Sequence, residues 1–176
     1  GYRMPSVVWL QVGRVDGDVE IHIIDEIIHQ TNIKTEELAE KILGKGYPTM
    51  QYFCDPAGVG MQSTSGIGDI EVFKRYGIFP RFRTDKVSRN IPSGIDLVRS
   101  FVENAEKKAR LYVNESCKGV IEDFENYRYP EKRDNQTLKD EPLKDGRHDH
   151  GMDAIRYFFI NKFPIKKREV LEISRW

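Results

Sequence analysis

The feature that most constrains the fold is a β-hairpin signal near the start of the chain. Residues 6–13 form a run dense in β-forming side chains, and residues 19–24 alternate apolar and polar side chains. Asp16 and Gly17, which lie between the two runs, are typical residues of a tight hairpin turn. The sequence therefore predicts two antiparallel strands joined by a short turn.

Helical and extended patterns alternate along the rest of the chain. We expect Thr35 to cap a helix in which Leu43 faces inward, and Asn114 to cap a helix that runs to about residue 126. Other helices are expected at residues 70–76 and 95–108, with Val102 inward, and strands at 49–54, 78–83 and 111–113. This alternation predicts an α/β fold with a mixed sheet.

Composition and charge exclude several classes of protein. The 176 residues fit one domain, and no apolar run is long enough to span a membrane. Because 28 basic residues balance 28 acidic ones, the chain is not a generally basic nucleic-acid binder, although local basic patches are compatible with this balance. Cys54 and Cys117 lack the spacing of a zinc site or a disulfide framework, which favours reduced thiols and a cytoplasmic setting.

A predicted helix around residues 148–157 carries side chains that can bind a metal ion. His150 and Asp153 lie three residues apart and Asp149 and Asp153 four apart, so each pair shares one side of the helix. An apolar stripe on the same helix can dock on a core; it consists of Met152, Ile155 and Phe159. Alternatively, Asp153 is a plain surface charge, and His148 and His150 are only a feature of the helix N-terminus.

Asp55, at the end of the expected 49–54 strand, is the best candidate for a second carboxylate. A strand end and a facing helix can bring carboxylates together, and such groups hold the paired divalent ions of phosphodiester hydrolases. The alternative is that Asp55-Pro56 only forms a turn.

A basic run lies before the expected 95–108 helix and consists of Arg81, Arg83, Lys86 and Arg89. A few such side chains can neutralise DNA phosphates without reading the base sequence, although a solvated charged surface has the same composition. Residues 127–146 are charged and rich in turn formers, which indicates a long hairpin or an exposed loop, either a gate over a site or a plain loop.

Four segments, in this order, are similar to the nuclease domain of the large terminase subunit of tailed bacteriophages. They are Asp55-Pro56-Ala57-Gly58, Gly94-Ile95-Asp96, Tyr127-Arg128-Tyr129-Pro130 and the H-x-x-D-A-x-R-Y pattern of residues 150–157. The last is the most specific, and together they span most of the chain. The resemblance implies a ribonuclease H-like fold: a mixed central β-sheet flanked by helices, with residues 127–147 as a hairpin or loop inserted before the last helix.

The resemblance also implies an activity: an endonuclease that cuts concatemeric double-stranded viral DNA with two Mg²⁺ or Mn²⁺ ions. In this scheme Asp55 and Asp153 are the catalytic, metal-binding carboxylates, and His150, an imidazole beside the metals, is a further catalytic residue and metal ligand. Asp149 is either a further metal ligand or a helix cap, and Arg156 and Tyr157 pack or pair structurally.

One carboxylate of the family is expected to be missing. The first catalytic aspartate of these nucleases lies on the first central strand, and residues 1–5 resemble the sequence that follows it. We therefore expect residues 1–176 to be a single nuclease domain without that strand, nearly inactive alone. The chain has no phosphate-binding G-x-x-x-x-G-K-[ST] motif, so the N-terminal ATPase domain of a terminase is also expected to be absent.

The implied partners are double-stranded DNA, the ATPase domain of the same polypeptide, the portal ring and the small terminase subunit, in the cytoplasm of the infected bacterial host. No membrane partner is expected. Two other functions are compatible with the sequence: another ribonuclease H-like nuclease, such as a Holliday-junction resolvase, or a domain that grips DNA or docks a portal ring without catalysis.

Overall fold

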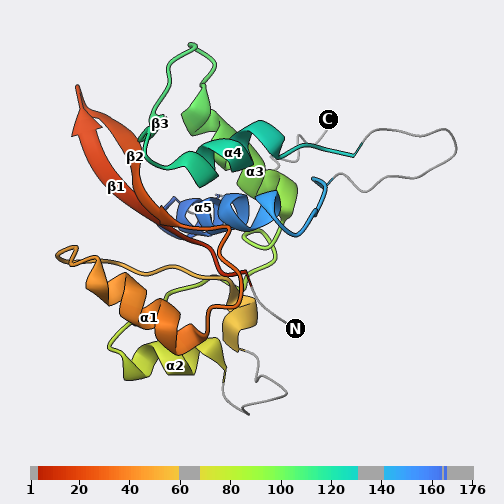
Figure 1. The fold of residues 1–176 in the computed structure, drawn as a ribbon. Helices are drawn as coiled ribbons and strands as arrows, with labels where there is room; N and C mark the ends of the chain where they lie inside the picture. The colour runs from red at the N-terminus through yellow and green to blue at the C-terminus, as the bar shows by residue number, and fades with distance from the viewer. Residues whose placement is uncertain (1–3, 60–67, 131–140, 164, 166–176) are drawn as a thin grey trace, which may run out of the picture.

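The computed structural model describes residues 4–59, 68–130, 141–163 and 165. In this part of the chain a three-stranded sheet of order β1-β2-β3 lies between two groups of helices (Figure 1). The elements are β1 (Val7–Val15), β2 (Asp18–Ile27), α1 (Thr35–Gly44), a 3₁₀ turn (Pro56–Val59), α2 (Asp69–Arg75), α3 (Ile91–Val102), β3 (Leu111–Val113), α4 (Lys118–Asn126) and α5 (His148–Lys162). The prediction of an α/β fold with a mixed sheet is confirmed.

The predicted hairpin is present. β1 and β2 pair antiparallel, and Asp16 and Gly17 both have positive φ, 51° and 87°, as a tight hairpin turn requires. The register shifts between Trp9 and Leu10, where a β-bulge changes the pairing. On its other side β2 pairs in parallel with β3, which makes the sheet mixed.

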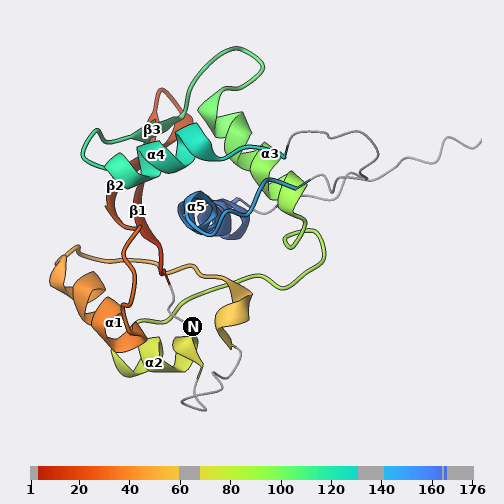
Figure 2. The same cartoon turned by 45° about the vertical axis from the view of Figure 1, so that its right-hand side comes forward.

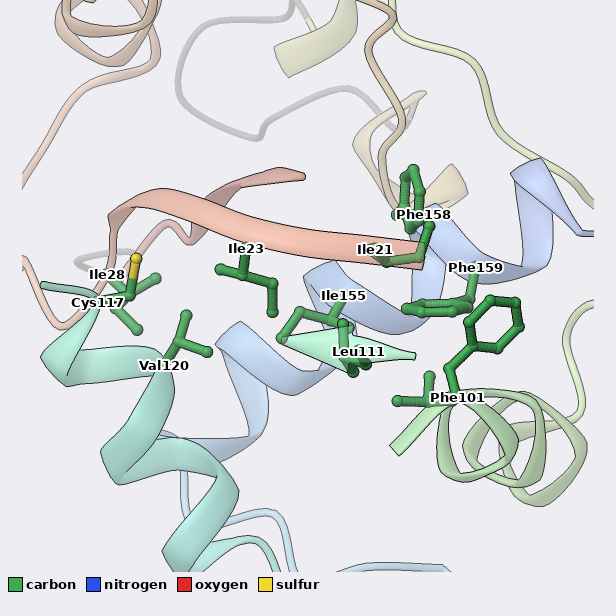
Figure 3. Close-up of a cluster of buried hydrophobic side chains, with 11 residues drawn as sticks. Ile21, Ile23, Ile28, Phe101, Leu111, Cys117, Val120, Ile155, Phe158 and Phe159 are labelled. Carbon is green, nitrogen blue, oxygen red and sulfur yellow. The ribbon is translucent and has the colours of Figure 1, made fainter. Parts of the chain in front are cut away.

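One face of the sheet packs against α3, α4 and α5 (Figure 3). Ile21 and Ile23 of β2 are fully buried there, against Ile155 and Phe159 of α5. Met152 packs at the margin of the same cluster, so the apolar stripe predicted for α5 is confirmed. Figure 2 views α5 nearly along its axis, enclosed between the sheet and α3 and α4.

The opposite face of the sheet packs against α1. Alternate residues of the hairpin, Trp9 and Ile27, are buried there together with Leu38 and Ile42 of α1. Thr35 Oγ1 donates a hydrogen bond to Asp69 Oδ1 over 2.8 Å and so links α1 to α2. The sheet is therefore covered on both faces, by two separate apolar clusters.

The prediction of strands at residues 49–54 and 78–83 is wrong. These segments meet at one parallel bridge, Phe53 with Arg81, supported by a bond from the Cys54 N–H to the Arg81 carbonyl (3.0 Å) and one from the Arg81 N–H to the Tyr52 carbonyl (2.8 Å). A longer parallel ladder would need a bond from the N–H of residue 56, which is a proline and has none, so the ladder stays short.

Two helix boundaries differ from those expected. The helix expected at 95–108 spans Ile91–Val102, because Asn90 accepts a hydrogen bond from the Ser93 N–H at its start and Glu103 is extended at its end. As a result, Val102 is 43% exposed instead of facing inward. The helix that Asn114 was expected to cap begins only at Lys118. The Asn114 side chain does not cap it, because its Oδ1 accepts a hydrogen bond from the Ser116 N–H within a turn.

The start of α1 also corrects an expectation. Its N-cap is Lys34, without a side-chain cap, while Thr35 bonds to α2. Leu43 is 44% exposed and does not face the core. The helix ends at Gly44.

Three further expectations concern the cysteines, the membrane and the inserted segment. Cys117 is buried and Cys54 is half-buried, and both are free thiols. None of the helices in the described residues is long and apolar enough to cross a membrane. The ends of the inserted segment are tied by a bond from the Leu143 N–H to the Arg128 carbonyl (2.8 Å), and residues 131–140 lie outside the described residues.

Candidate functional site

Asp153 lies on α5 and is held by cations. Its Oδ1 accepts hydrogen bonds from Arg156 Nε (3.2 Å) and Nη2 (2.8 Å), and Lys144 Nζ lies 3.8 Å from its Oδ2. The spacing of three residues puts Asp153 and Arg156 on one side of the helix. The Asp153 side chain is 17% exposed, so one edge of the carboxylate faces solvent.

Arg156 is the buried centre of this arrangement. Its side chain packs over Gly94 of α3, where a Cβ would come within 2.8 Å of the Arg156 Cδ. The guanidinium carbon lies 4.6 Å from the centroid of the Tyr157 ring. The pKa of Arg156 is raised because the pairing with Asp153 outweighs the effect of burial, and the side chain therefore carries a full charge.

Asp55 follows the Phe53–Arg81 bridge and begins a turn. Its Oδ1 accepts a hydrogen bond from the Ala57 N–H over 2.8 Å, and the side chain is exposed. The turn-former alternative for Asp55 thus describes its local geometry. That bond occupies Oδ1 and directs the carboxylate toward a cavity.

The cavity beside Asp55 has a volume of about 420 Å³ and joins it to α5. Its lining includes Arg156 and Tyr157 of α5 together with cations from elsewhere in the chain: Arg83, Arg89 and Lys144. Pro56, Ser88 and Ile160 complete much of the remaining wall. One carboxylate and several cations therefore share this hollow, next to the Asp153–Arg156 pair.

Tyr157 of α5 lines the same cavity as Asp55. Burial raises the pKa of its phenol to about 12, with Asp55 and Asp153 both adding to the rise and Arg156 opposing it. A negative charge disfavours ionisation of a phenol only at short range in water. Asp55 lines the cavity together with Arg156, which bonds to Asp153, so the two carboxylates lie in the same region of the molecule although they are far apart in sequence.

The two other predicted ligands have different surroundings. Asp149 is buried, and its Oδ1 accepts a hydrogen bond from the N–H of Gly146, which precedes the helix (2.8 Å). The N-cap of α5 is Arg147, without a side-chain cap bond, so Asp149 does not cap the helix as the alternative supposed. His150 is half-buried and has no hydrogen bond or ion pair to another described residue. Their roles as metal ligands stay predictions.

The donor set fits a hard cation only in part. Within residues 4–59, 68–130 and 141–163, no three His, Cys, Asp or Glu side chains are close enough to hold an ion. Mg²⁺, however, is commonly bound through one or two carboxylates, with waters and substrate phosphate oxygens completing its shell. Asp55 and the Arg156-bound Asp153 are the two carboxylates of this region, and no closed protein cage is present among the described residues.

The predicted basic run divides into two pairs. Arg83 and Arg89 line the cavity, while Arg81 and Lys86 are exposed and do not. Sequence reasoning missed Lys144, which reaches the cavity from the end of the inserted segment. The charged composition of residues 127–146 was its only signal.

Arg156 also lines a second cavity, of about 410 Å³, between α3 and α5. Its walls are mainly apolar, with Val98, Phe124 and Met152, and Tyr127 adds a phenol. Burial, followed by Asp153, raises the pKa of Tyr127 to about 12, so this phenol stays neutral. The Tyr127 phenol is therefore not available as a general base at neutral pH.

Comparison with known proteins identifies no relative: no family model, no curated protein and no solved structure matches the chain.

Proposed function

We propose that this chain is the nuclease domain of a viral DNA-packaging terminase, a divalent-metal-dependent endonuclease of ribonuclease H-like fold. The proposal combines the ordered motifs of the sequence with one structural observation. That observation is the cavity lined by Asp55 and by Arg156 and Tyr157 of α5, with Arg83, Arg89 and Lys144 around it. Asp153 lies beside this cavity, paired with Arg156. Carboxylates for a hard cation and side-chain cations for phosphates are what phosphodiester hydrolysis needs.

Each group has a defined task in this scheme. Asp55 and Asp153 would hold Mg²⁺ or Mn²⁺, which would supply an activated water and charge stabilisation for the leaving oxygen. Arg156 orients the Asp153 carboxylate from the side, through two N–H groups on one oxygen. Tyr157, neutral at physiological pH, forms part of the wall between the two carboxylates.

The cations of the cavity bind the DNA backbone. Arg83, Arg89 and Lys144 come from two separate segments, so they can contact successive phosphates without reading the bases. Binding should therefore weaken steeply as salt is added. In the full proposal the substrate is concatemeric double-stranded DNA, and the partners are the terminase ATPase domain, the portal ring and the small subunit, in the cytoplasm of the infected bacterium.

Calorimetric titration with Mn²⁺ tests the metal site. We expect Asp55→Asn and Asp153→Asn each to weaken Mn²⁺ binding by tenfold or more, about 1.4 kcal/mol, because each removes a charged oxygen ligand. Asp96→Asn is the matched control, since Asp96 is a 75% exposed aspartate on α3 outside the cavity lining. Identical titrations for the wild type and both site variants would overturn the proposal.

The DNA-binding half of the proposal has its own measurement. Arg83→Ala and Arg89→Ala should weaken binding to a double-stranded oligonucleotide and make binding less dependent on salt. Cleavage of supercoiled plasmid with Mn²⁺ should fall with the same variants and with Asp55→Asn and Asp153→Asn. Lys118→Ala, on α4 and outside the cavity lining, is the control.

One observation favours a second function. Asp153 already pairs with Arg156 and lies near Lys144, an arrangement that also suits a domain that grips DNA without catalysis. The titration separates the two: a gripping domain binds DNA with its salt dependence intact but shows no Mn²⁺ binding that depends on Asp55 or Asp153.

A further inference from the structure

A second group of ionisable side chains lies where the end of β2, α4 and the start of α5 meet. His29 Nε2 and Asp123 Oδ1 are 2.7 Å apart, and His148 Nε2 lies 3.2 Å from Glu122 Oε1. Asp145 Oδ2 lies 2.6 Å from His148 Nδ1 and continues the chain of contacts. None of these side chains lines the cavity of Asp55.

Asp123 is the buried member of this group. Its side chain is 0% exposed, and among the described residues its Oδ2 has no hydrogen-bond partner. That oxygen faces Gly151 of α5, where a Cβ would overlap it. α4 and α5 can therefore approach this closely only because residue 151 has no side chain and Asp123 fills the space.

His29 adopts an unusual backbone conformation that places its ring. It follows β2 by two residues and has φ of +56°, in the left-handed region that costs energy for a residue with a side chain. Its side chain is 13% exposed, and its ring meets that of His148 edge to face, with centroids 5.8 Å apart. The bond to Asp123 offsets part of that strain.

The charge on Asp123 is poorly compensated. Burial raises its pKa, and the bond and charge of His29 oppose the rise, as does the charge of His148, while Glu122 adds to it. The other charged groups near this junction are Asp145 and Arg147 before α5 and Glu26, which binds the first turn of α4. A buried carboxylate is costly when only one of its oxygens is bonded to another described side chain.

We propose that His29 and Asp123 are positioning residues that hold α5, and with it Asp153 and Tyr157, against β2 and α4 through a proton-dependent hydrogen bond. When the Asp123 carboxyl is protonated, the pair carries no net charge and is compatible with its buried place. Without that proton, a net negative charge is buried against the backbone of α5. The effect on catalysis rests on the proposed function, whereas the positioning of α5 does not.

The direction of the pH effect follows from the pKa of Asp123. A carboxyl whose pKa is higher in the folded chain favours the folded state most strongly in acid, and the contribution is lost as the pH rises through that folded-state pKa. The start of α5 should therefore be held more tightly at mildly acidic than at alkaline pH. Asp123→Asn removes the ionisation and should remove the pH dependence while keeping an oxygen acceptor for His29.

Amide hydrogen exchange in α5 measures this directly. Protection factors, corrected for intrinsic exchange, are compared between about pH 5 and pH 8 for the wild type, His29→Gln and Asp123→Asn. We expect His29→Gln to lower protection of the first turns of α5 about tenfold or more, as the loss of a hydrogen bond to a charged group implies. His22→Gln is the matched control, because His22 is a 44% exposed histidine on β2.

The outcomes are distinct. Selective loss of protection in α5 with His29→Gln, together with a flat pH profile for Asp123→Asn, supports the proposal. A uniform loss over all elements, or a profile for both variants like that of His22→Gln, overturns it. Absence of Mn²⁺ binding by the wild type would contradict the proposed function and leave the exchange result to decide the positioning role by itself.

Discussion

At the scale of single residues, Arg156 connects the core to the candidate site. Its aliphatic side-chain carbons pack over Gly94, its guanidinium donates hydrogen bonds to Asp153, and its charge lies against the ring of Tyr157. A buried arginine is tolerated when its charge is paired and its N–H groups are used, and Arg156 meets both conditions. The geometry of Asp153 is therefore set from inside the protein and not from solvent.

Gly94→Ala tests this connection. A Cβ at residue 94 would lie 2.8 Å from the Arg156 Cδ and 2.9 Å from its Cγ, so the arginine must shift. We expect a loss of about 1–3 kcal/mol in the free energy of unfolding, as for other overpacked sites, and weaker Mn²⁺ binding because Asp153 moves with Arg156. Urea denaturation and calorimetry provide the two measurements.

The control is Gly44→Ala, in helix α1. Nothing lies within 4 Å of a Cβ there, and the backbone is not left-handed, so this change should be neutral or slightly stabilising. Equal effects of the two substitutions would show that the packing of Arg156 on Gly94 does not constrain the site.

At the scale of elements, α4 begins without a cap of its own. Its N-cap residue, Cys117, makes no side-chain cap bond. Glu26 of β2 supplies the acceptors instead, with Oε1 bound to the Gly119 N–H (2.9 Å) and Oε2 to the Val120 N–H (2.7 Å). A carboxylate at a helix N-terminus also interacts favourably with the helix dipole. One side chain thereby joins the sheet to the helix that carries Asp123.

Glu26→Gln should weaken this junction. An amide presents one oxygen and one NH₂ group, so one of the two N–H groups of α4 loses its acceptor, and the charge at the helix start is lost. We expect a decrease of about 1–2 kcal/mol in the free energy of unfolding, the usual effect of losing a cap. Glu37→Gln on α1, where the side chain is 50% exposed, should change it by less than about 0.5 kcal/mol.

Local patterns were sufficient for the elements whose partners are near in sequence. The hairpin, α2 and the apolar stripe of α5 follow from turn residues and periodicity within a few residues. The strand predictions for residues 49–54 and 78–83 failed because a strand also needs a hydrogen-bonded partner strand. These two segments form only a single bridge, between Phe53 and Arg81. Thr35 failed as a cap because its hydroxyl bonds to Asp69, a tertiary contact.

The same limit applies to the candidate site: local patterns indicated some of its residues but not the tertiary contacts between them. Asp55, Asp153, Arg83 and Arg89 were indicated by spacing and resemblance, and the structure brings them to one cavity and its edge. The contribution of Lys144 and the contact of Arg156 with Gly94 depend on how distant segments pack, which no local pattern encodes. The His29–Asp123 pair, 94 residues apart in sequence, was missed for the same reason.

At the scale of the whole molecule, one thin sheet separates two apolar clusters. Successive hairpin residues alternate between them: Leu10 and Ile23 pack toward α5, while Trp9 and Ile24 pack toward α1. The two clusters therefore share the same hairpin backbone, so unfolding of the hairpin disrupts both clusters together. This arrangement predicts a single cooperative unfolding transition.

Ile155→Ala and Leu38→Ala test this coupling, one in each cluster. Ile155 is 0% exposed and Leu38 is 6% exposed, so each truncation should cost about 2–5 kcal/mol. Both should shift the same urea transition, with circular dichroism and tryptophan fluorescence giving coincident curves. Val12→Ala, at a 41% exposed position of β1, is the control. Separate transitions for the two probes would contradict the shared sheet.

The placement of α5 has a consequence for synthesis on the ribosome. α5 is the last of the helices in the described residues, yet it covers Ile21 and Ile23 from the beginning of the chain. Until residues 148–162 have left the exit tunnel, one apolar face of the hairpin lacks the cover of α5 and is open to chaperones or to other nascent chains. The core of the described residues is therefore completed only by the helix that carries Asp153.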